Sequence, residues 1–248
     1  FGNHRVGNPY LPGKERKVGV SKWLQNQSPD VIGWQELNGY STARLRDEAQ
    51  QWGHEYAVLL KERGYDLGLS SVYPIEVVER VTDGMHHGFL HARTAGVDFI
   101  VCHLWPFKGK QRLQEINPIL ARARKSLEAG RSLILLGDFN ALSPEDQRLM
   151  NATSMNWYKG WKWETTKAGQ AHTDVIQAVL DLGMRDTWAT HRPLSFSSFP
   201  ERPRVDYIFA SPDLMGTCTQ STWFETEAMH LLSDHVPLAA YFSISPAD

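Results

Sequence analysis

The sequence predicts an α/β protein in which two β-sheets pack against each other and helices flank them. Short apolar runs rich in β-branched and aromatic residues recur along the chain, and amphipathic segments stand between them at irregular intervals. The sequence contains neither a GxGxxG motif nor a P-loop, which disfavours a dinucleotide-binding fold. Because the apolar runs are spread evenly over 248 residues, we expect one domain, residues 1–248.

Seven segments have the composition of β-strands. Their hydrophobicity is nearly continuous rather than alternating, which indicates burial on both faces of a sheet. We expect the strands at residues 30–34, 56–60, 67–72, 97–104, 133–136, 205–210 and 237–244.

Three segments have the apolar period of helices, and we expect them at residues 20–27, 113–127 and 175–182. Gly130 is the expected stop of the second helix, while Pro118 is expected to end or kink one of its early turns. Thr173 is the candidate N-cap of the third helix and Gly183 its terminator.

The composition is that of a soluble globular protein, with 42% hydrophobic and 22% charged residues and no apolar run near the ~20 residues that span a bilayer. A formal net charge of −2 gives no global attraction to polyanions. Two cysteines cannot form a disulfide framework, and Cys102 is expected to be a buried structural thiol. The sequence begins without an initiator Met, so we expect a trimmed form and leave the compartment open.

Several hydrophobic runs end in acid, amide or imidazole side chains. In chain order these runs are DVIGWQE, VCHL, LILLGDFN, RVDYIF and LLSDH. A metal-dependent phosphoester hydrolase needs such side chains, because it must bind a hard cation through oxygen atoms, orient a water and stabilise a phosphoryl oxyanion.

From Asn3 to His235 the ordered set WQE, HL, GDFN, DYIF and SDH resembles the endonuclease/exonuclease/phosphatase family. That family includes deoxyribonuclease I, neutral sphingomyelinases and inositol polyphosphate 5-phosphatases. The resemblance implies a four-layer α/β sandwich with two packed mixed β-sheets flanked by helices. It also implies hydrolysis of phosphoesters with a divalent cation, Mg²⁺ or, in its place, Mn²⁺.

The resemblance assigns the metal to Glu36, supported by Asn3, with Asp234 near the cation or the attacking water. Asp138 and Asn140 match the paired groups that hold the water, the cation and the phosphate. Residues i and i+2 of an extended strand end lie on the same side, so both can reach one substrate atom. We expect the carboxylate to accept a proton or hydrogen bond from water and the amide to donate to a phosphoryl oxygen.

His235 matches the general base of the family, and Asp206 matches the acid that orients it. An imidazole can accept a proton from water near neutral pH when its other nitrogen is held in the right tautomer. His103 matches the histidine of the deoxyribonuclease and sphingomyelinase branches, where apurinic endonucleases have a tyrosine. Glu62 resembles the acid that partners this histidine in deoxyribonuclease I.

The remaining histidines have no ligand spacing to one another, so a zinc cluster is not expected, and we interpret His86 and His87 as parts of a turn between glycines. Residues 151–166 follow the GDFN run and carry Trp157, Trp161 and Trp163 among lysines. Their rings either stack on a substrate or cover the edge of a sheet.

We expect a phosphodiesterase that acts on nucleic acid, with DNA and RNA both open as substrates, and that works as a monomer. A phosphodiesterase or phosphatase for a small-molecule or lipid-headgroup phosphoester is the alternative, because the core site recognises only a phosphoester and the surrounding loops set specificity. A catalytically idle binding module on the same fold is a third hypothesis, which the intact set of site residues disfavours.

Overall fold

The computed structural model describes residues 13–160, 165–199 and 202–244. Its strands are β1 (Val31–Trp34), β2 (Tyr56–Leu59), β3 (Gly68–Ser71), β4 (Glu76–Val81), β5 (Phe89–Thr94), β6 (Val97–His103), β7 (Leu133–Asp138), β8 (Arg185–Asp186), β9 (Asp206–Ala210), β10 (Cys218–Trp223) and β11 (Leu238–Phe242). Its helices are α1 (Gly13–Gln27), α2 (Thr42–Ala49), α3 (Gly109–Glu128), α4 (Pro144–Arg148), α5 (Ala152–Gly160), α6 (Asp174–Asp181), α7 (Thr187–His191), α8 (Pro212–Met215) and α9 (Glu227–Leu232), with a 3₁₀ turn at Gln50–Trp52.

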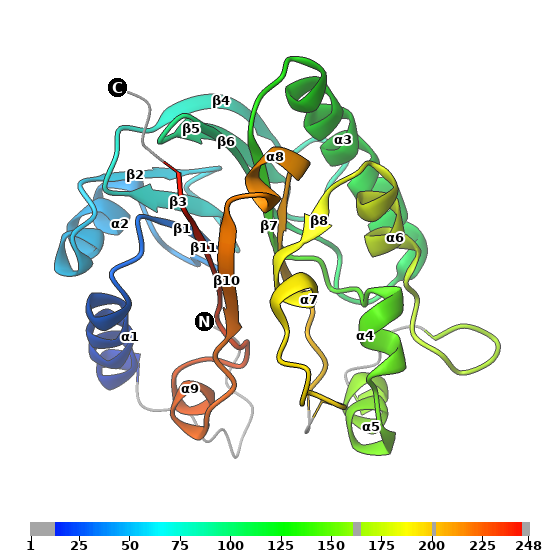
Figure 1. Ribbon diagram of the computed structural model, residues 1–248. Coiled ribbons are helices and arrows are strands. Elements are labelled where there is room, and N and C mark those ends of the chain that lie inside the picture. The colour runs from blue at the N-terminus through cyan, green and yellow to red at the C-terminus, as the bar shows by residue number, and fades with distance from the viewer. Residues whose placement is uncertain (1–12, 161–164, 200–201, 245–248) are drawn as a thin grey trace.

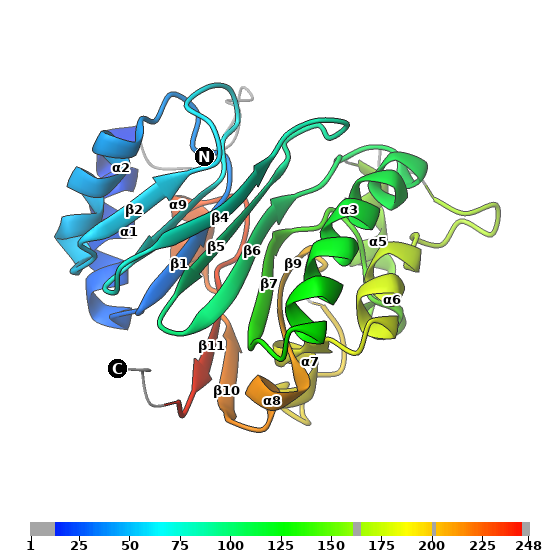
Figure 2. The same cartoon turned by 90° about the horizontal axis from the view of Figure 1, so that it is seen from above.

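Four layers make up the fold, as the resemblance implies (Figures 1 and 2). One of the two inner layers is a mixed sheet of order β4-β5-β6-β7-β9-β8, in which β6 and β7 are parallel and the other pairs antiparallel. The second β layer consists of two antiparallel sheets, β1-β3-β2 and β10-β11. Helices α3 and α6 cover the outer face of the mixed sheet, and α1 and α2 lie on the far side of the second layer (Figure 2).

The pleat of β6 shows how the layers are joined. Ile100 and Cys102 point to the core beneath α3 and α6, while Phe99 and Val101 point to the core between the two β layers. All of β6 is buried, as its continuous hydrophobicity predicts. Cys102 and Cys218 are free thiols, and burial raises the pKa of Cys102 well above its usual value.

Pro118 does not end its helix, because α3 runs through it as one element from Gly109 to Glu128. The buried face of α3, which includes Ile116, Ile119 and Ala123, packs against the mixed sheet and offsets the hydrogen bond that proline cannot donate. Helix α6 ends before Gly183, which has φ +94°, as predicted. Thr173 precedes α6, but its side chain makes no capping hydrogen bond.

The sequence patterns missed strands β4, β5, β8 and β10. Strand β4 alternates exposed and half-buried residues at an edge of the sheet, and β5 carries His91 and Arg93 inside a buried strand. A tertiary contact explains the second case, because both side chains pair with Asp98 on the neighbouring strand. Apolar periodicity therefore could not identify β5 as a strand.

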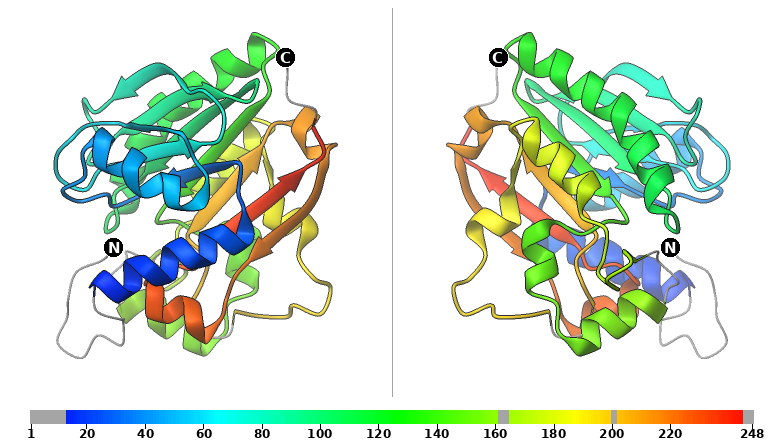
Figure 3. Two further views of the ribbon diagram at one scale, coloured as in Figure 1. Left: turned by 90° about the vertical axis from the view of Figure 1, so that its left-hand side faces the viewer. Right: turned by 90° about the vertical axis from the view of Figure 1, so that its right-hand side faces the viewer.

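Helices α1 and α9 pack side by side at one rim of the molecule (Figure 3). A side chain at Gly19 of α1 would collide with Leu232 of α9, which shows how closely they approach. The two leucines of the LLSDH motif are the last residues of α9, so this contact fixes where Ser233, Asp234 and His235 leave the helix. No helix among the described residues is long and apolar enough to cross a membrane.

We expect Gly137→Ala to reduce the free energy of unfolding by at least about 2 kcal/mol, because Gly137 has φ +136° and a Cβ there would lie 1.9 Å from the carbonyl oxygen of Cys102. Urea denaturation measures the loss. Gly13→Ala is the control, since its Cβ would meet no atom within 4 Å. Equal stability of the two variants would contradict this account of the close approach between β7 and β6.

Candidate active site

The register of the mixed sheet places three polar residues in one row at the strand ends. His103 of β6 pairs with Asp138 of β7, and Asp138 pairs with Asp206 of β9. Each residue ends or begins an apolar strand. The buried part of the strand fixes its backbone, and its side chain projects where the strand ends. Residues that are far apart in sequence, from the VCHL, GDFN and DYIF motifs, are thus brought together by strand pairing alone.

Asp138 is the most enclosed member of the row, with 4% of its surface exposed. Its Oδ1 accepts a hydrogen bond from the backbone amide of Asn140 at 2.8 Å, and its Oδ2 accepts one from the Asn140 side chain at 3.0 Å. The Nε2 atom of His103 lies 3.2 Å from Oδ2. Burial raises the pKa of Asp138, and the charges of Asp206 and Glu36 act in the same direction against His235, which lowers it.

Asn140 reaches this position because its backbone is left-handed, with φ +48°, a conformation that asparagine tolerates better than most residues. The Nδ2 amide donates to the carbonyl of Leu104 and to Asp138, both at 3.0 Å. Both hydrogens of the amide are therefore engaged. In this structure Asn140 orients Asp138, and the expected donation to a phosphoryl oxygen would require one of these bonds to be exchanged.

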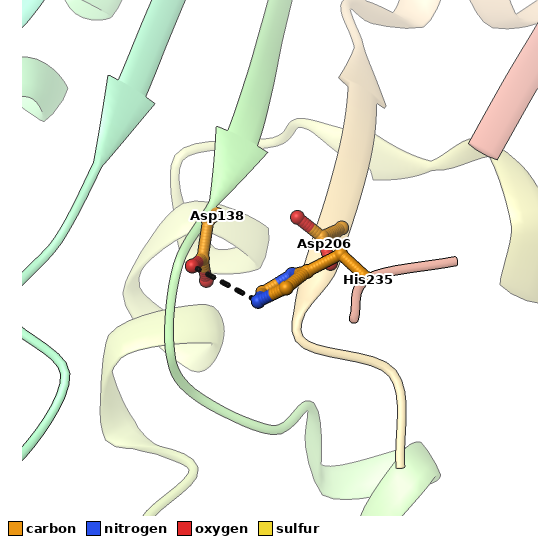
Figure 4. Close-up of side chains that lie close together, drawn as sticks. All are labelled: Asp138, Asp206 and His235. Atoms are coloured by element: carbon orange, nitrogen blue, oxygen red, sulfur yellow. Dashed lines mark hydrogen bonds and ion pairs between the residues drawn. The ribbon is translucent and has the colours of Figure 1, made fainter. Parts of the chain in front are cut away.

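His235 and Asp206 form the predicted pair (Figure 4). The Nδ1 atom of His235 lies 2.7 Å from Oδ2 of Asp206, and its Nε2 faces Oδ2 of Asp138 at 3.9 Å. Partial burial lowers the pKa of His235, but the carboxylates of Asp206 and Asp138 outweigh this effect and raise it well above its usual value. The imidazole keeps 40% of its side-chain surface exposed, so solvent and substrate can reach it.

His103 lies against a residue that the sequence analysis placed in a structural turn. The rings of His87 and His103 stack with centroids 4.0 Å apart and planes 14° apart. Burial lowers the pKa of His87 to about 4, and the charges of His86 and Lys61 act in the same direction. Burial also lowers the pKa of His103 well below its usual value, and His87 and His235 add to this effect. His87 precedes the unpredicted strand β5, so no sequence pattern placed it here.

Glu62 does not pair with His103, which corrects the expected partnership. Its exposed carboxylate accepts a hydrogen bond at 2.8 Å from the backbone amide of Thr42, at the start of α2. Among the residues described, the Nε2 atom of His103 faces the carboxylate of Asp138 instead. The loop that carries Glu62 therefore stabilises a helix end and does not contact His103.

The predicted metal ligands are only partly visible. Glu36 and Asp234 line the same cavity as Asp138, Asp206 and His235, a cavity of about 530 Å³ that extends between the two β layers. Glu36 has φ +56°, an uncommon conformation outside glycine that turns the chain just after β1. Asn3 lies outside the described residues.

Within the described ranges, one group of three side chains has donor atoms close enough to hold a metal ion. Asp138, Asp206 and His235 each offer one ligand atom, and these atoms lie within 4.8 Å of one another. Clustered carboxylates at the end of a partly closed cavity fit a hard divalent cation, because its charge would offset their mutual repulsion.

The aromatic segment after GDFN is only partly described. Trp157, on α5, is half-buried and packs against a small core that includes Leu142 and Val205, while the guanidinium of Arg202 lies 6.0 Å from its ring. The packing interpretation therefore holds for at least part of the Trp157 ring. Trp161 and Trp163 lie outside the described residues.

The model of the endonuclease/exonuclease/phosphatase family matches residues 3–235. The chain belongs to this family. No protein with a curated description matches its sequence. Solved structures of similar fold include an AP endonuclease from Archaeoglobus fulgidus, with 19% identity, a TM-score of 0.68 and coverage of 93% of this chain and 95% of that one.

Two further structures of similar fold come from Neisseria. One is a 3′ phosphatase bound to a product DNA hairpin, with 19% identity, a TM-score of 0.69 and coverage of 93% and 95% of the two chains. The other is a 3′-5′ exonuclease from Neisseria meningitidis, with 20% identity, a TM-score of 0.69 and coverage of 92% and 95%. These likenesses confirm the four-layer fold.

In this member of the endonuclease/exonuclease/phosphatase family, a buried ion network holds the chain on both sides of Asp206. Arg204, which is 1% exposed, donates to Asp186 at 2.6 and 2.9 Å and to Asp146 at 2.8 Å. The hydroxyl of Tyr207 donates to Asp146 and accepts from the amide of Ser143. Arg204 and Tyr207, which stand just before and just after Val205 and Asp206, are thereby tied to the segment that follows Asn140.

We expect Arg204→Ala to lower the free energy of unfolding by about 3–5 kcal/mol, because it would leave two buried carboxylates without their cation. Chemical denaturation measures the change. Lys17→Ala, which breaks a partly exposed ion pair with Glu48, is the matched control and should cost at most about 1 kcal/mol. A similar, small effect of both substitutions would show that the network does not stabilise the fold.

Proposed function

We propose that the protein is a divalent-metal-dependent phosphodiesterase that acts on nucleic acid. The observation that carries this proposal is the convergence of His235, held by Asp206, with the buried carboxylate of Asp138. Membership of a family of phosphoester hydrolases supports the reaction type. The named activities of the structural neighbours, an AP endonuclease, a 3′ phosphatase with product DNA and an exonuclease, support nucleic acid as the substrate class.

In the proposed reaction, the imidazole of His235 accepts a proton from the attacking water at Nε2, the nitrogen that faces Asp138. Asp206 fixes the tautomer by accepting the hydrogen bond of Nδ1. Asp138, held by Asn140, orients the water for in-line attack on phosphorus. No covalent intermediate with the protein is needed, because water itself attacks.

His103 contributes a hydrogen bond rather than a charge. Its low pKa keeps the ring neutral near pH 7, and its Nδ1 has no hydrogen-bond partner among the described residues. A neutral imidazole can donate one hydrogen bond and accept another. We propose that it contacts an oxygen of the phosphate or of the leaving group.

The metal would be held by Glu36 and Asp234, with Asn3 in support and the Asp138 carboxylate adjacent. Oxygen donors without a thiolate favour Mg²⁺, with Mn²⁺ as a substitute. The cation would supply neutralisation of the charge that develops on the phosphoryl group and the leaving oxygen.

One observation favours a second candidate substrate class, an amphiphilic phosphoester. The cavity of about 530 Å³ that reaches the site is lined largely by apolar side chains, among them Trp23, Leu136 and Phe242. An apolar group attached to a phosphoester would find contacts there that nucleic acid would not use. This observation favours a lipid-headgroup or other amphiphilic phosphoester as the second candidate.

We expect hydrolysis of single- or double-stranded oligonucleotides in Mg²⁺, and loss of turnover after chelation that Mg²⁺ or Mn²⁺ restores, because the clustered carboxylates need a cation. A substrate panel with an oligonucleotide, a choline phospholipid and a small phosphate monoester measures the choice. Full activity of exhaustively chelated protein would refute metal dependence. Turnover of the lipid alone would replace the nuclease proposal with the second candidate, and no turnover at all would favour a binding module.

We expect His235→Ala to lower kcat on the preferred substrate by a factor on the order of 10² to 10⁴, the usual loss when a general base is removed. Asp206→Asn should also lower kcat, because an amide can hold the imidazole in the wrong tautomer. His230→Ala is the matched control, since His230 pairs with Glu225 at 2.8 Å outside the residues that line the cavity. If kcat stayed near wild type in both site variants, the base would have to be reassigned to Asp138.

A further inference from the structure

A continuous series of aromatic rings leads to the protein surface from His103, one of the row of polar residues at the strand ends. His87 stacks on His103, the ring of His86 lies 4.2 Å from that of His87, and the ring of Trp105 lies 4.0 Å from that of His86. Phe107 follows at 6.4 Å from Trp105. The series thus begins 3.2 Å from the Asp138 carboxylate, at His103, and ends in solvent at Phe107, which is 50% exposed.

The exposed end of this series is held in place by buried polar side chains. Glu115 of α3, 5% exposed, accepts hydrogen bonds from the backbone amides of His86 at 2.6 Å and Trp105 at 2.8 Å. Arg112, one turn earlier, donates to the carbonyls of Trp105 and Pro106 at 3.3 and 3.1 Å. Two loops from different parts of the chain are therefore fixed to one helix, and the exposed rings are presented on a rigid base.

Two further features point to a ligand at this place. The indole Nε1 of Trp105 and the Nδ1 of the 4% exposed His103 are buried, and neither has a hydrogen-bond partner among the described residues. Buried polar atoms are nearly always satisfied in folded proteins, so a bound partner would explain both. Exposed Lys108 and Lys110 follow Phe107 in the chain, and a combination of exposed rings and cations suits single-stranded nucleic acid.

We propose that His86, Trp105 and Phe107 form a base-stacking subsite, which binds an unpaired nucleobase of the nucleotide next to the scissile phosphate. This inference rests on the proposed nuclease function. Stacking on substrate is one of two roles open to the tryptophans after GDFN. This inference assigns that role instead to rings near the end of β6, the strand that pairs with β7 on the side away from β9. An apolar lipid chain is the competing occupant of exposed rings, and the experiment separates the two.

The test compares single-stranded oligonucleotides that carry either a base or a tetrahydrofuran abasic residue on each side of the scissile phosphate. For the wild type, we expect kcat/KM to fall by about 5- to 150-fold when the stacked base is removed, the range that one base–aromatic contact contributes. The loss should occur for one of the two positions. Wild-type protein that cleaves both kinds of oligonucleotide equally would overturn the subsite but leave the nuclease proposal intact.

Three substitutions at Phe107 distinguish stacking from apolar packing. Phe107→Ala and Phe107→Leu should both bring the ratio of kcat/KM for base-bearing over abasic substrate towards one, whereas Phe107→Trp should keep it. Leu194→Ala is the control, because Leu194 is a fully exposed apolar residue far along the chain. A Phe107→Leu variant with the wild-type ratio would show that the ring is not a stacking platform, and so would a Phe107→Ala variant with that ratio.

Failure of the nuclease proposal has a different signature. If the wild type cleaved no oligonucleotide but hydrolysed a phospholipid, both proposals would fall, and the rings would have to be assigned to the lipid surface. Melting temperatures of the Phe107 variants should stay within a few degrees of the wild type, since the side chain is half exposed.

Discussion

The buried carboxylate of Asp138 is the constraint on which the rest of the site depends. A carboxylate withdrawn from water is costly unless its lone pairs find donors or a cation. Asn140 supplies two hydrogen bonds from a left-handed turn, His103 approaches from the neighbouring strand, and His235 approaches from the loop after α9. The shape of that turn, the strand register and the packing of α9 are therefore linked through one side chain.

Buried ions tie together the chain segments around this carboxylate. Arg204, just before β9, connects with Asp146 and Asp186, and Glu115 of α3 connects the loops of His86 and Trp105. In both places a charged side chain replaces hydrophobic packing, which cannot fix the direction of a loop. Such ties hold catalytic geometry in position before the substrate binds.

The sequence predicted those parts of the site that end an apolar strand. The GDFN, DYIF and VCHL motifs place their polar residues at strand ends, where burial of the strand alone decides the position. It could not place His87, because β5 is stabilised by the pairing of His91 and Arg93 with Asp98 rather than by an apolar pattern. Glu62 failed for a related reason, since a three-residue match within a turn carries no information about its direction.

Electrostatics explain why the proposed reaction relies on a cation. His103 and His87 have low pKa values and stay neutral near pH 7, and the pKa of His235 is high only because of the carboxylates beside it. Those two carboxylates balance the charge that His235 gains when it accepts a proton in the proposed reaction, so this group offers no net positive charge to a phosphodiester. Glu36 and Asp234 add negative charge to the same cavity. These acids would repel the negative charge of a phosphodiester. A divalent ion bound among them would turn that repulsion into attraction.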